Sequence, residues 1–230
     1  MFVQPAAPGT GWKPDTTAMH DDSARRHAPA TERNRDPILA VLHRVLPPAG
    51  TVLEIASGTG EHAIHFAPRL HPRHWQPSDT APAALASIAA WLARHPADNL
   101  LPPITLDATD PGWPQRLAGT RPAITAIVCI NLIHIAPWSA CLGLLAGAGR
   151  LLPAAGRLVL YGPFRRHGEH TAPGNTAFDH SLRARNPAWG VRNLETVAAA
   201  AREAGLVLIE VVPMPANNLI TVFAPASPAA

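Results

Sequence analysis

The fold is set by Thr51-Val-Leu-Glu-Ile-Ala-Ser-Gly-Thr-Gly-Glu-His-Ala-Ile-His-Phe66. Its apolar run 52–55 predicts a buried strand, and the helical spacing from Glu61 predicts a helix. Gly58 and Gly60 lie between them and suit a tight turn, because a Cβ there would hinder both the turn and the close approach of a ligand. A strand, a glycine turn and a helix N-terminus together predict a site where backbone N–H groups face a nucleotide-like cofactor.

Two kinds of cofactor site fit this stretch. Gly58-x-Gly60-x-x-Ala63 matches the dinucleotide fingerprint, whose third glycine can be alanine. Glu54-x-Ala56-x-Gly58-x-Gly60 also resembles motif I of the class I S-adenosylmethionine methyltransferases, E-x-G-x-G-x-G, with the first glycine replaced. An ordinary strand-to-helix turn is the third interpretation, so the neighbouring sequence has to decide.

Composition narrows the class of protein. A chain of 230 residues with 47% hydrophobic and 15% charged residues fits one globular α/β domain. The formal net charge is only +3, and the doublets Arg25-Arg26 and Arg165-Arg166 are isolated. Because no basic stripe is interleaved with aromatic residues, we do not expect nucleic-acid binding.

The cysteines and the apolar runs bear on the compartment. Cys129 and Cys141 fall in apolar segments without disulfide spacing, which predicts a reduced, cytoplasmic location. No apolar run reaches the roughly 18 residues of a membrane span, and the N-terminus lacks the pattern of a secretory signal. We therefore expect no membrane association.

Acidic residues follow the next two predicted strands. The strand at 74–77 leads to Asp79, 19 residues beyond Gly60 (79 − 60), close to the roughly 20-residue offset of a ribose-binding carboxylate. The strand at 104–106 leads to Asp107, where motif III of the methyltransferases places an acidic residue that accepts from the adenine amino group. Helix capping by Asp79 and turn formation by Asp107 are the plainer alternatives. Dinucleotide folds have no general need for Asp107, so the series of strand ends favours the methyltransferase interpretation.

The following strands carry polar residues at the same edge. The apolar run 123–130 predicts a central strand, and Asn131 and His134 come directly after it. Ligands bind at the carboxyl edge of open α/β sheets, so both are candidates for the site. A fifth strand over 157–161 leads into a long segment, 162–192, whose length between regular elements is typical of a functional insert.

The two ends of the chain are predicted as follows. Strands at 206–212 and 219–223 form a closing hairpin. Asp36-Pro37 predicts a helix start, with aspartate as N-cap and proline at the first helical position. A single domain is expected over 21–223, with further segments assigned as a flexible N-terminal arm (1–20), an N-terminal lid (21–36) and a frayed tail (224–230).

Five βα units and a closing hairpin resemble the class I methyltransferase fold. That resemblance implies a three-layer α-β-α, Rossmann-like architecture with a mostly parallel seven-stranded sheet ending in an antiparallel hairpin. More specifically, about 22–223 is similar to a small methyltransferase-like family that includes methyltransferase-like protein 26. The matching strings are Ala30-Thr-Glu-Arg-Asn34, Val52-Leu-Glu-Ile-Ala-Ser-Gly-Thr-Gly-Glu-His62, Trp75-Gln-Pro-Ser-Asp79, Cys129-Ile-Asn-Leu-Ile-His-Ile-Ala-Pro-Trp138, Leu160-Tyr-Gly-Pro-Phe164, Ser181-Leu-Arg-Ala-Arg185 and Met214-Pro-Ala-Asn-Asn218.

The resemblance implies a cofactor and a set of contacts. S-adenosylmethionine is the expected methyl donor and S-adenosylhomocysteine the product. Arg33 could pair with the cofactor carboxylate, although a plain surface arginine is an equal alternative. The family usually has Arg-Asp-Pro where this chain has Arg185-Asn186-Pro187, whereas Ala56 is usual for it. The residues assigned to the cofactor are Arg33, Asn34, Glu54, Ala56, Ser57, Gly58, Gly60, Asp79, Asp107, Ala108 and Asn131.

The acceptor side is assigned more loosely. His134 has a near-neutral intrinsic pKa and could take a proton from the acceptor, with a structural hydrogen bond as the alternative. His167 and His170 lack further ligands, so no metal is predicted. The catalytic candidates are His134, Tyr161 and Asp179, and the substrate-binding candidates are His134, Tyr161, Phe164, Phe178, Asn217 and Asn218.

The sequence thus predicts an S-adenosylmethionine-dependent methyltransferase that acts on an O, N or S atom of a small molecule by in-line transfer. Two alternatives stay open: a module that binds the cofactor without transferring the methyl group, and an NAD-dependent oxidoreductase, which gives Asp107 no role. The expected partner is a small-molecule substrate, and the expected assembly is a monomer or a homodimer.

Overall fold

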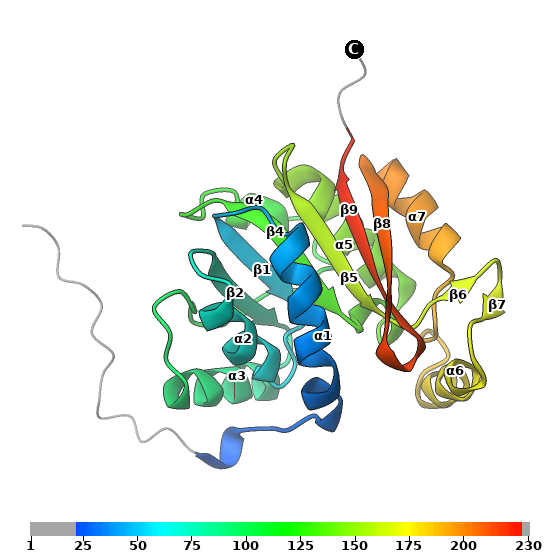
Figure 1. Ribbon diagram of the computed structural model, residues 1–230, viewed down its shortest axis with the longest axis horizontal. Coiled ribbons are helices and arrows are strands. Elements are labelled where there is room, and N and C mark those ends of the chain that lie inside the picture. Colours follow the sequence, from blue (N-terminus) through cyan, green and yellow to red (C-terminus); the bar gives the residue numbers. More distant parts are fainter. Residues whose placement is uncertain (1–21, 227–230) are drawn as a thin grey trace, which may run out of the picture.

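A computed structural model describes residues 22–226 as an α/β fold around one seven-stranded sheet (Figure 1). The strand order is β3-β2-β1-β4-β5-β9-β8, and every neighbouring pair is parallel except the two that include β9. This confirms the predicted class I methyltransferase architecture. The strands are β1 Thr51–Ile55, β2 His74–Asp79, β3 Ile104–Thr105, β4 Ile124–Ile130, β5 Arg157–Gly162, β8 Leu206–Met214 and β9 Asn218–Pro225.

Helices cover both faces of the sheet and enclose two apolar cores (Figure 1). One core lies under α1 and α2, and the other lies under α4, α5 and α7. The helices are α1 Pro29–Val45, α2 Glu61–Phe66, α3 Pro82–Arg94, α4 Trp113–Leu117, α5 Trp138–Leu151, α6 Pro173–Arg185 and α7 Leu194–Glu203, with 3-10 turns η1 Asp22–Ala24, η2 Ala67–Arg69, η3 Leu132–His134 and η4 Pro215–Asn217.

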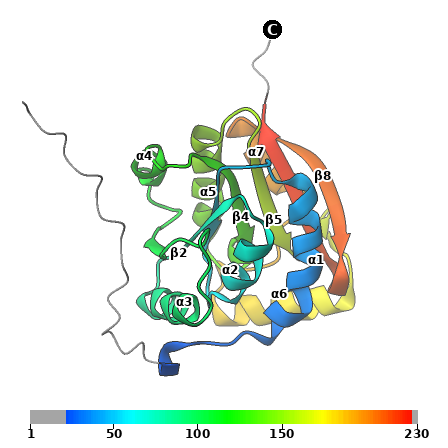
Figure 2. The same ribbon diagram turned by 60° about the vertical axis from the view of Figure 1, so that its left-hand side comes forward.

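The segment 162–192 forms a two-stranded hairpin followed by α6. Its strands, β6 Arg165–Arg166 and β7 Glu169–His170, stand apart from the main sheet. Figures 1 and 2 show α6 lying across one end of the sheet, beside the turn between β8 and β9. The side-chain amide of Asn175 fastens the two by donating to the Asn217 carbonyl oxygen at 3.0 Å. The insert thus closes off the carboxyl edge next to β5.

The first long helix begins earlier than the sequence predicts. α1 starts at Pro29, so the second half of the segment 21–36 is helical and Pro37 lies inside the helix. Asp36 does not cap it; its carboxylate lies 2.8 Å from His65 Nε2. Proline is suited to the first helical position, and buried Thr31 and Asn34 anchor the turns before Pro37. Tertiary contacts therefore carry the helix past a residue that usually ends one.

The chain ends differ in part from the prediction. The predicted arm, 1–20, lies outside the described residues, as do 227–230. Ala224 and Pro225 belong to β9, so the prediction of a frayed tail from 224 is wrong at these two positions. Over 22–226, no helix combines the length and apolar character needed to cross a membrane.

Gly58 and Gly60 are glycines for different physical reasons. Both have positive φ, +59° and +90°. A Cβ on Gly60 would lie 2.8 Å from the Ile88 Cα, so glycine there lets the start of α2 pack against α3. A Cβ on Gly58 would meet no atom within 4 Å, so it would project into open space in front of the turn. Gly60 therefore serves helix packing, and Gly58 leaves room for a ligand.

We predict that Gly60→Ala destabilises the fold well beyond the cost of its positive φ. Gly205→Ala is the matched control, because Gly205 has φ +75° and open space around a Cβ. The control should lose about 1 kcal/mol of unfolding free energy, and Gly60→Ala about 2 kcal/mol more, because Ile88 has to move. Urea denaturation without ligand measures both; equal losses would contradict the packing role.

Candidate functional site

Asp79 ties the glycine turn to the end of β2. Its Oδ2 accepts the Gly58 N–H at 3.0 Å, and its Oδ1 accepts the Ala81 N–H at 3.0 Å. The carboxylate is 9% exposed. Each carboxylate oxygen can accept more than one hydrogen bond, so Asp79 can hold the turn and still accept from a ligand hydroxyl. Asp79 does not cap α3, whose N-cap is Ala81 without a side-chain cap, so its contacts are those to the turn and to the chain that leads into the helix.

Glu54 lies beneath the turn rather than on its open side. The side chain is 1% exposed, and its Oε2 accepts the Trp75 indole N–H at 3.0 Å. Burial raises the pKa of Glu54 to about 7, against the opposing effect of hydrogen bonds from Trp75 and Ser57. The backbone of Ser57 in turn donates to the Ser78 carbonyl oxygen at 2.8 Å. These two predicted cofactor residues build the floor of the turn.

The next strand ends carry the other predicted cofactor residues. Asp107 is exposed after β3, and its Oδ1 accepts from the backbone and the hydroxyl of Thr109 at 2.8 and 2.7 Å. Ala108 is buried beside it. Asn131 follows β4 with φ +65°, and Ala56 follows β1 with φ +59°. Asp79 and Asp107 therefore lie at the ends of β2 and β3, on the same side of the glycine turn that follows β1.

A cavity of about 220 Å³ opens at the carboxyl ends of β4 and β5. Five residues that the sequence predicts for the site meet there: Asn34 from α1, Asn131, Tyr161, Phe178 from α6 and Asn218. They come from positions far apart in the chain, as expected when parallel strands end at one edge. The complete lining is Ala30, Asn34, Asn131, Tyr161, Pro163, Asn175, Phe178, Ala216 and Asn218.

Asn175 lines the cavity, although it is not among the site residues predicted from the sequence. It is 6% exposed near the start of α6, and its amide donates to Thr171 Oγ1 as well as to the Asn217 backbone, both at 3.0 Å. Asn217 itself contributes this carbonyl and is not part of the cavity lining. The only available signal was the length of the insert, because no motif distinguishes Asn175 within it.

Asn34 and Tyr161 form a buried polar pair at the cavity wall. Asn34 Oδ1 lies 2.9 Å from His62 Nε2, and the Asn34 side chain also hydrogen bonds to the Tyr161 phenol. Burial raises the pKa of Tyr161, with Asn34 and the nearby Arg33 opposing the shift. Burial also lowers the pKa of His62 to about 3. At neutral pH Tyr161 is therefore protonated and His62 neutral, while Arg33 is an exposed residue of α1.

His134 and Phe164 lie behind the cavity instead of on it. His134 is fully buried, its Nδ1 accepts the Arg192 N–H at 3.2 Å, and its ring meets Phe164 edge-on at 5.0 Å. Burial lowers the pKa of His134 to about 3. A Cβ on Gly162 would lie 2.6 Å from His134 Nε2, so the ring backs directly onto the strand end. This is the structural role that the sequence left open, and we do not propose His134 as a base.

Asp179 fastens the insert and does not line the cavity. Its Oδ2 pairs with Arg165 and Arg183, each at 3.0 Å, and its Oδ1 accepts the Val191 N–H at 2.7 Å. Burial alone would raise the pKa of Asp179. The hydrogen bond from Val191 and the charges of Arg183 and Arg165 outweigh this effect, so the pKa lies below its ordinary value. The carboxylate stays charged within its own network, and we drop it as a catalytic candidate.

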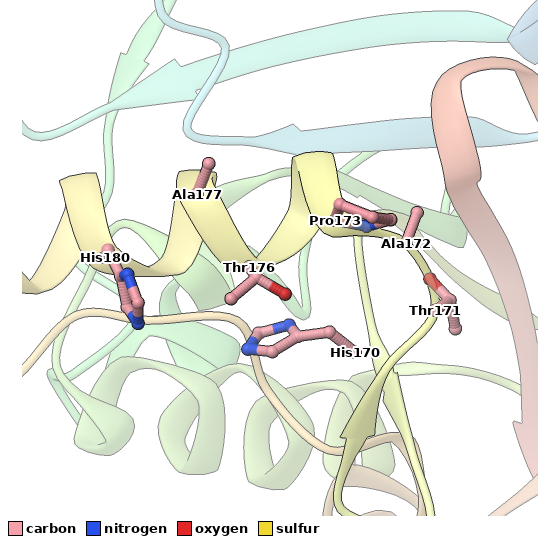
Figure 3. Close-up of a pocket in the computed structure, with 7 residues that line it drawn as sticks. All are labelled: His170, Thr171, Ala172, Pro173, Thr176, Ala177 and His180. Carbon is pink, nitrogen blue, oxygen red and sulfur yellow. The ribbon is translucent and has the colours of Figure 1, made fainter.

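A second, larger hollow of about 600 Å³ lies along α6 (Figure 3). His170 and His180 border it, and His170 Nε2 lies 3.0 Å from an Arg165 nitrogen. None of its lining residues comes from a strand end of the main sheet. The complete lining is His170, Thr171, Ala172, Pro173, Thr176, Ala177 and His180, and we place the functional site at the smaller cavity instead.

A family model described as "Protein of unknown function (DUF938)" matches residues 25–225. The chain belongs to this family. The finer resemblance to the group of methyltransferase-like protein 26 stays a prediction, because the family description names no activity.

The solved structures with a similar fold include one described as an S-adenosylmethionine-dependent methyltransferase, SibL. An O-methyltransferase family 2 protein from Planctomyces limnophilus in complex with apigenin has a TM-score of 0.70 and 20% identity, over 93% of this chain and 63% of that one. An O-methyltransferase family protein from Burkholderia thailandensis gives 0.70 and 16%, over 87% and 58%. The SAH-bound form of CalO1, a methyltransferase in calicheamicin biosynthesis, gives 0.63 and 20%, over 84% and 54%. The chain thus spans a little over half the length of these structures.

We predict that Glu54 lowers the free energy of unfolding as the pH rises from 4.5 to 7. Its folded pKa of about 7 lies above the ordinary 4.5, so the folded state binds more protons between these values. The contribution, about 3 kcal/mol, is fully present below pH 4.5 and is lost as the pH rises to 7. Glu54→Gln keeps an acceptor for Trp75 and should flatten this loss. Denaturation at pH 4.5, 6 and 7.5 tests it; an unchanged pH slope in the variant would contradict the assignment.

Proposed function

We propose that the protein is an S-adenosylmethionine-dependent methyltransferase that acts on a small molecule. The observation that carries this proposal is the pair Asp79 and Asp107 at neighbouring strand ends, beside a turn with open space over Gly58. A carboxylate at each strand end matches a ligand that presents hydroxyl and amino donors, as the ribose and adenine of this cofactor do. Glycine at the turn lets the ligand approach the backbone closely.

The residues present fit the cofactor. Asp79 would accept from the ribose hydroxyls and Asp107 from the adenine amino group, while the backbone at Gly58 faces the open space. Asn131 would border the methionine end, because it lies between β4 and the cavity. Arg33, exposed on α1, is our candidate for the cofactor carboxylate. When bound, the cofactor supplies an activated methyl group.

The adjoining cavity is our candidate site for the methyl acceptor. It lies at the ends of β4 and β5, and α6 contributes Asn175 and Phe178 to its wall. Displacement at the methyl carbon needs an aligned nucleophile more than it needs chemical groups, and a cavity with fixed walls provides alignment. Tyr161, Asn175 and Phe178 would hold the acceptor in place.

The two alternative functions each leave a feature of the structure without a role. A binding module without transferase activity would use the cofactor site and leave the cavity without a purpose. An NAD-dependent oxidoreductase would use the glycine turn and Asp79 and leave Asp107 without one. Neither explains why five predicted residues meet in a cavity beside the turn.

We predict that calorimetric titration detects micromolar binding of S-adenosylmethionine and S-adenosylhomocysteine and none of NAD. Asp107→Ala should weaken both by about tenfold or more, because it removes a charged acceptor worth about 1.5–3 kcal/mol. Asp98→Ala is the matched control, since the Asp98 side chain is 86% exposed and its ion pair with His71 is long, at 3.9 Å. NAD binding alone, or equal effects of the two substitutions, would overturn the cofactor assignment.

A further inference from the structure

The acceptor cavity is lined without a formal charge. Its nine described lining residues comprise four carboxamides, one phenol and four apolar side chains. A buried charge without a partner costs several kcal/mol, so such a cavity disfavours charged ligands. Its volume, about 220 Å³, lies below the roughly 300–1,000 Å³ of ordinary ligand sites. The cavity therefore suits a small, uncharged molecule.

Two of the carboxamides have their donors in use and their acceptors available. Asn175 donates to Thr171 Oγ1 and the Asn217 carbonyl oxygen, and Asn218 donates to the carbonyl oxygens of 215–216. Within residues 22–226, no hydrogen bond reaches the side-chain oxygen of Asn175 or Asn218. A ligand that donates hydrogen bonds, such as a hydroxylated molecule, complements these oxygens.

Among residues 22–226, the groups around the cavity include no effective general base. Tyr161 keeps its proton, because burial raises its pKa, and Arg33 is a cation. His62 behind Asn34 and His134 behind Gly162 both have pKa values lowered to about 3 by burial. Asp179 on α6 is held by its arginines. An efficient base needs a pKa near the working pH, and none of these groups has one. Glu54 has a pKa of about 7, but it is buried beneath the glycine turn against Trp75 and does not line the cavity.

We propose that the methyl acceptor is a small, uncharged, hydroxylated thiol that reacts without a general base from the protein. This rests on the proposed function. The thiol binds neutral and loses its proton to solvent, and the positive charge of the sulfonium is the partner that the cavity lining does not supply to the thiolate. The thiolate sulfur forms a bond to the methyl carbon, and the bond from that carbon to the sulfonium sulfur breaks with its electrons on the leaving sulfur. The thiol of free cysteine has a pKa of about 8.5, so a thiol provides a fraction of its own thiolate near neutrality. An alcohol would need a base, which the described residues of the cavity do not supply.

Binding of S-methyl compounds to the cavity tests the proposed acceptor without requiring turnover. Ligand-observed NMR titrations, with S-adenosylhomocysteine present, compare three S-methyl compounds: neutral 3-(methylthio)-1,2-propanediol, cationic 2-(methylthio)ethylamine and anionic 3-(methylthio)propanoate. The neutral diol should bind about tenfold or more tightly than either charged compound, a difference of about 1.4 kcal/mol. Equal or tighter binding of a charged compound would overturn the proposal.

A variant with a charge added to the cavity lining tests the same preference in the opposite direction. Asn131→Asp places a carboxylate in the lining at a left-handed position that aspartate tolerates as asparagine does. It should move the preference from the neutral diol to the cation. Asn186→Asp is the matched control, because Asn186 lies outside the lining and its Oδ1 accepts the Ala188 N–H, as an aspartate oxygen would. A switch in both variants, or in neither, would contradict the placement of the acceptor.

A third experiment measures methyl transfer itself. S-adenosylhomocysteine formation should occur with 1-thioglycerol and not with glycerol, and its rate should rise about tenfold per pH unit below the pKa of the thiol. Methylation of glycerol, or a pH profile set by one protein group for every acceptor, would overturn the proposal. If S-adenosylhomocysteine binds by calorimetry while the diol fails to bind, only the acceptor inference falls; loss of cofactor binding overturns the proposed function itself.

Discussion

The Asp79 carboxylate is the point on which the proposed cofactor site depends. One oxygen holds the N–H of Gly58, and the other holds the N–H that leads into α3. Ser57 strengthens the same junction through Ser78, and Glu54 supports it from below. The turn is therefore fixed relative to β2 before any ligand arrives. A preformed turn spares a ligand part of the ordering cost of binding.

The second constraint comes from the chain just before α1. The Ala28 N–H donates to Glu61 at 2.7 Å, and Arg26 exchanges hydrogen bonds with Ser87 and Trp91 of α3. These contacts fix the start of α1 beside the glycine turn and bring Asn34 against His62 and Tyr161. The cavity is then completed from the other side by α6 and the β8–β9 turn. The start of α1 thus forms one wall of the cavity, and α6 with the β8–β9 turn forms the other.

Much of the fold was predictable because its signals are local. Apolar runs marked the strands, and the rule that parallel strands end at one edge brought Asn131 and Tyr161 to one cavity, with Asn218 arriving through the closing hairpin. Three features were not predictable, because they depend on partners distant in sequence. α1 begins at Pro29 through contacts with α2, His134 is buried by Arg192 and Phe164, and Asn175 is positioned by the β8–β9 turn. A sequence gives the chemical type of such residues but not which neighbours use their hydrogen bonds.

The central claim is that the cofactor lies against the glycine turn and extends toward the cavity. Amide chemical shifts followed by NMR during titration with S-adenosylhomocysteine test it most directly. We expect the largest changes at Gly58, Gly60 and Asp107, with Asn131 also affected and Gly168 in the insert hairpin unchanged. Changes confined to the hollow along α6, with the glycine turn unaffected, would contradict it.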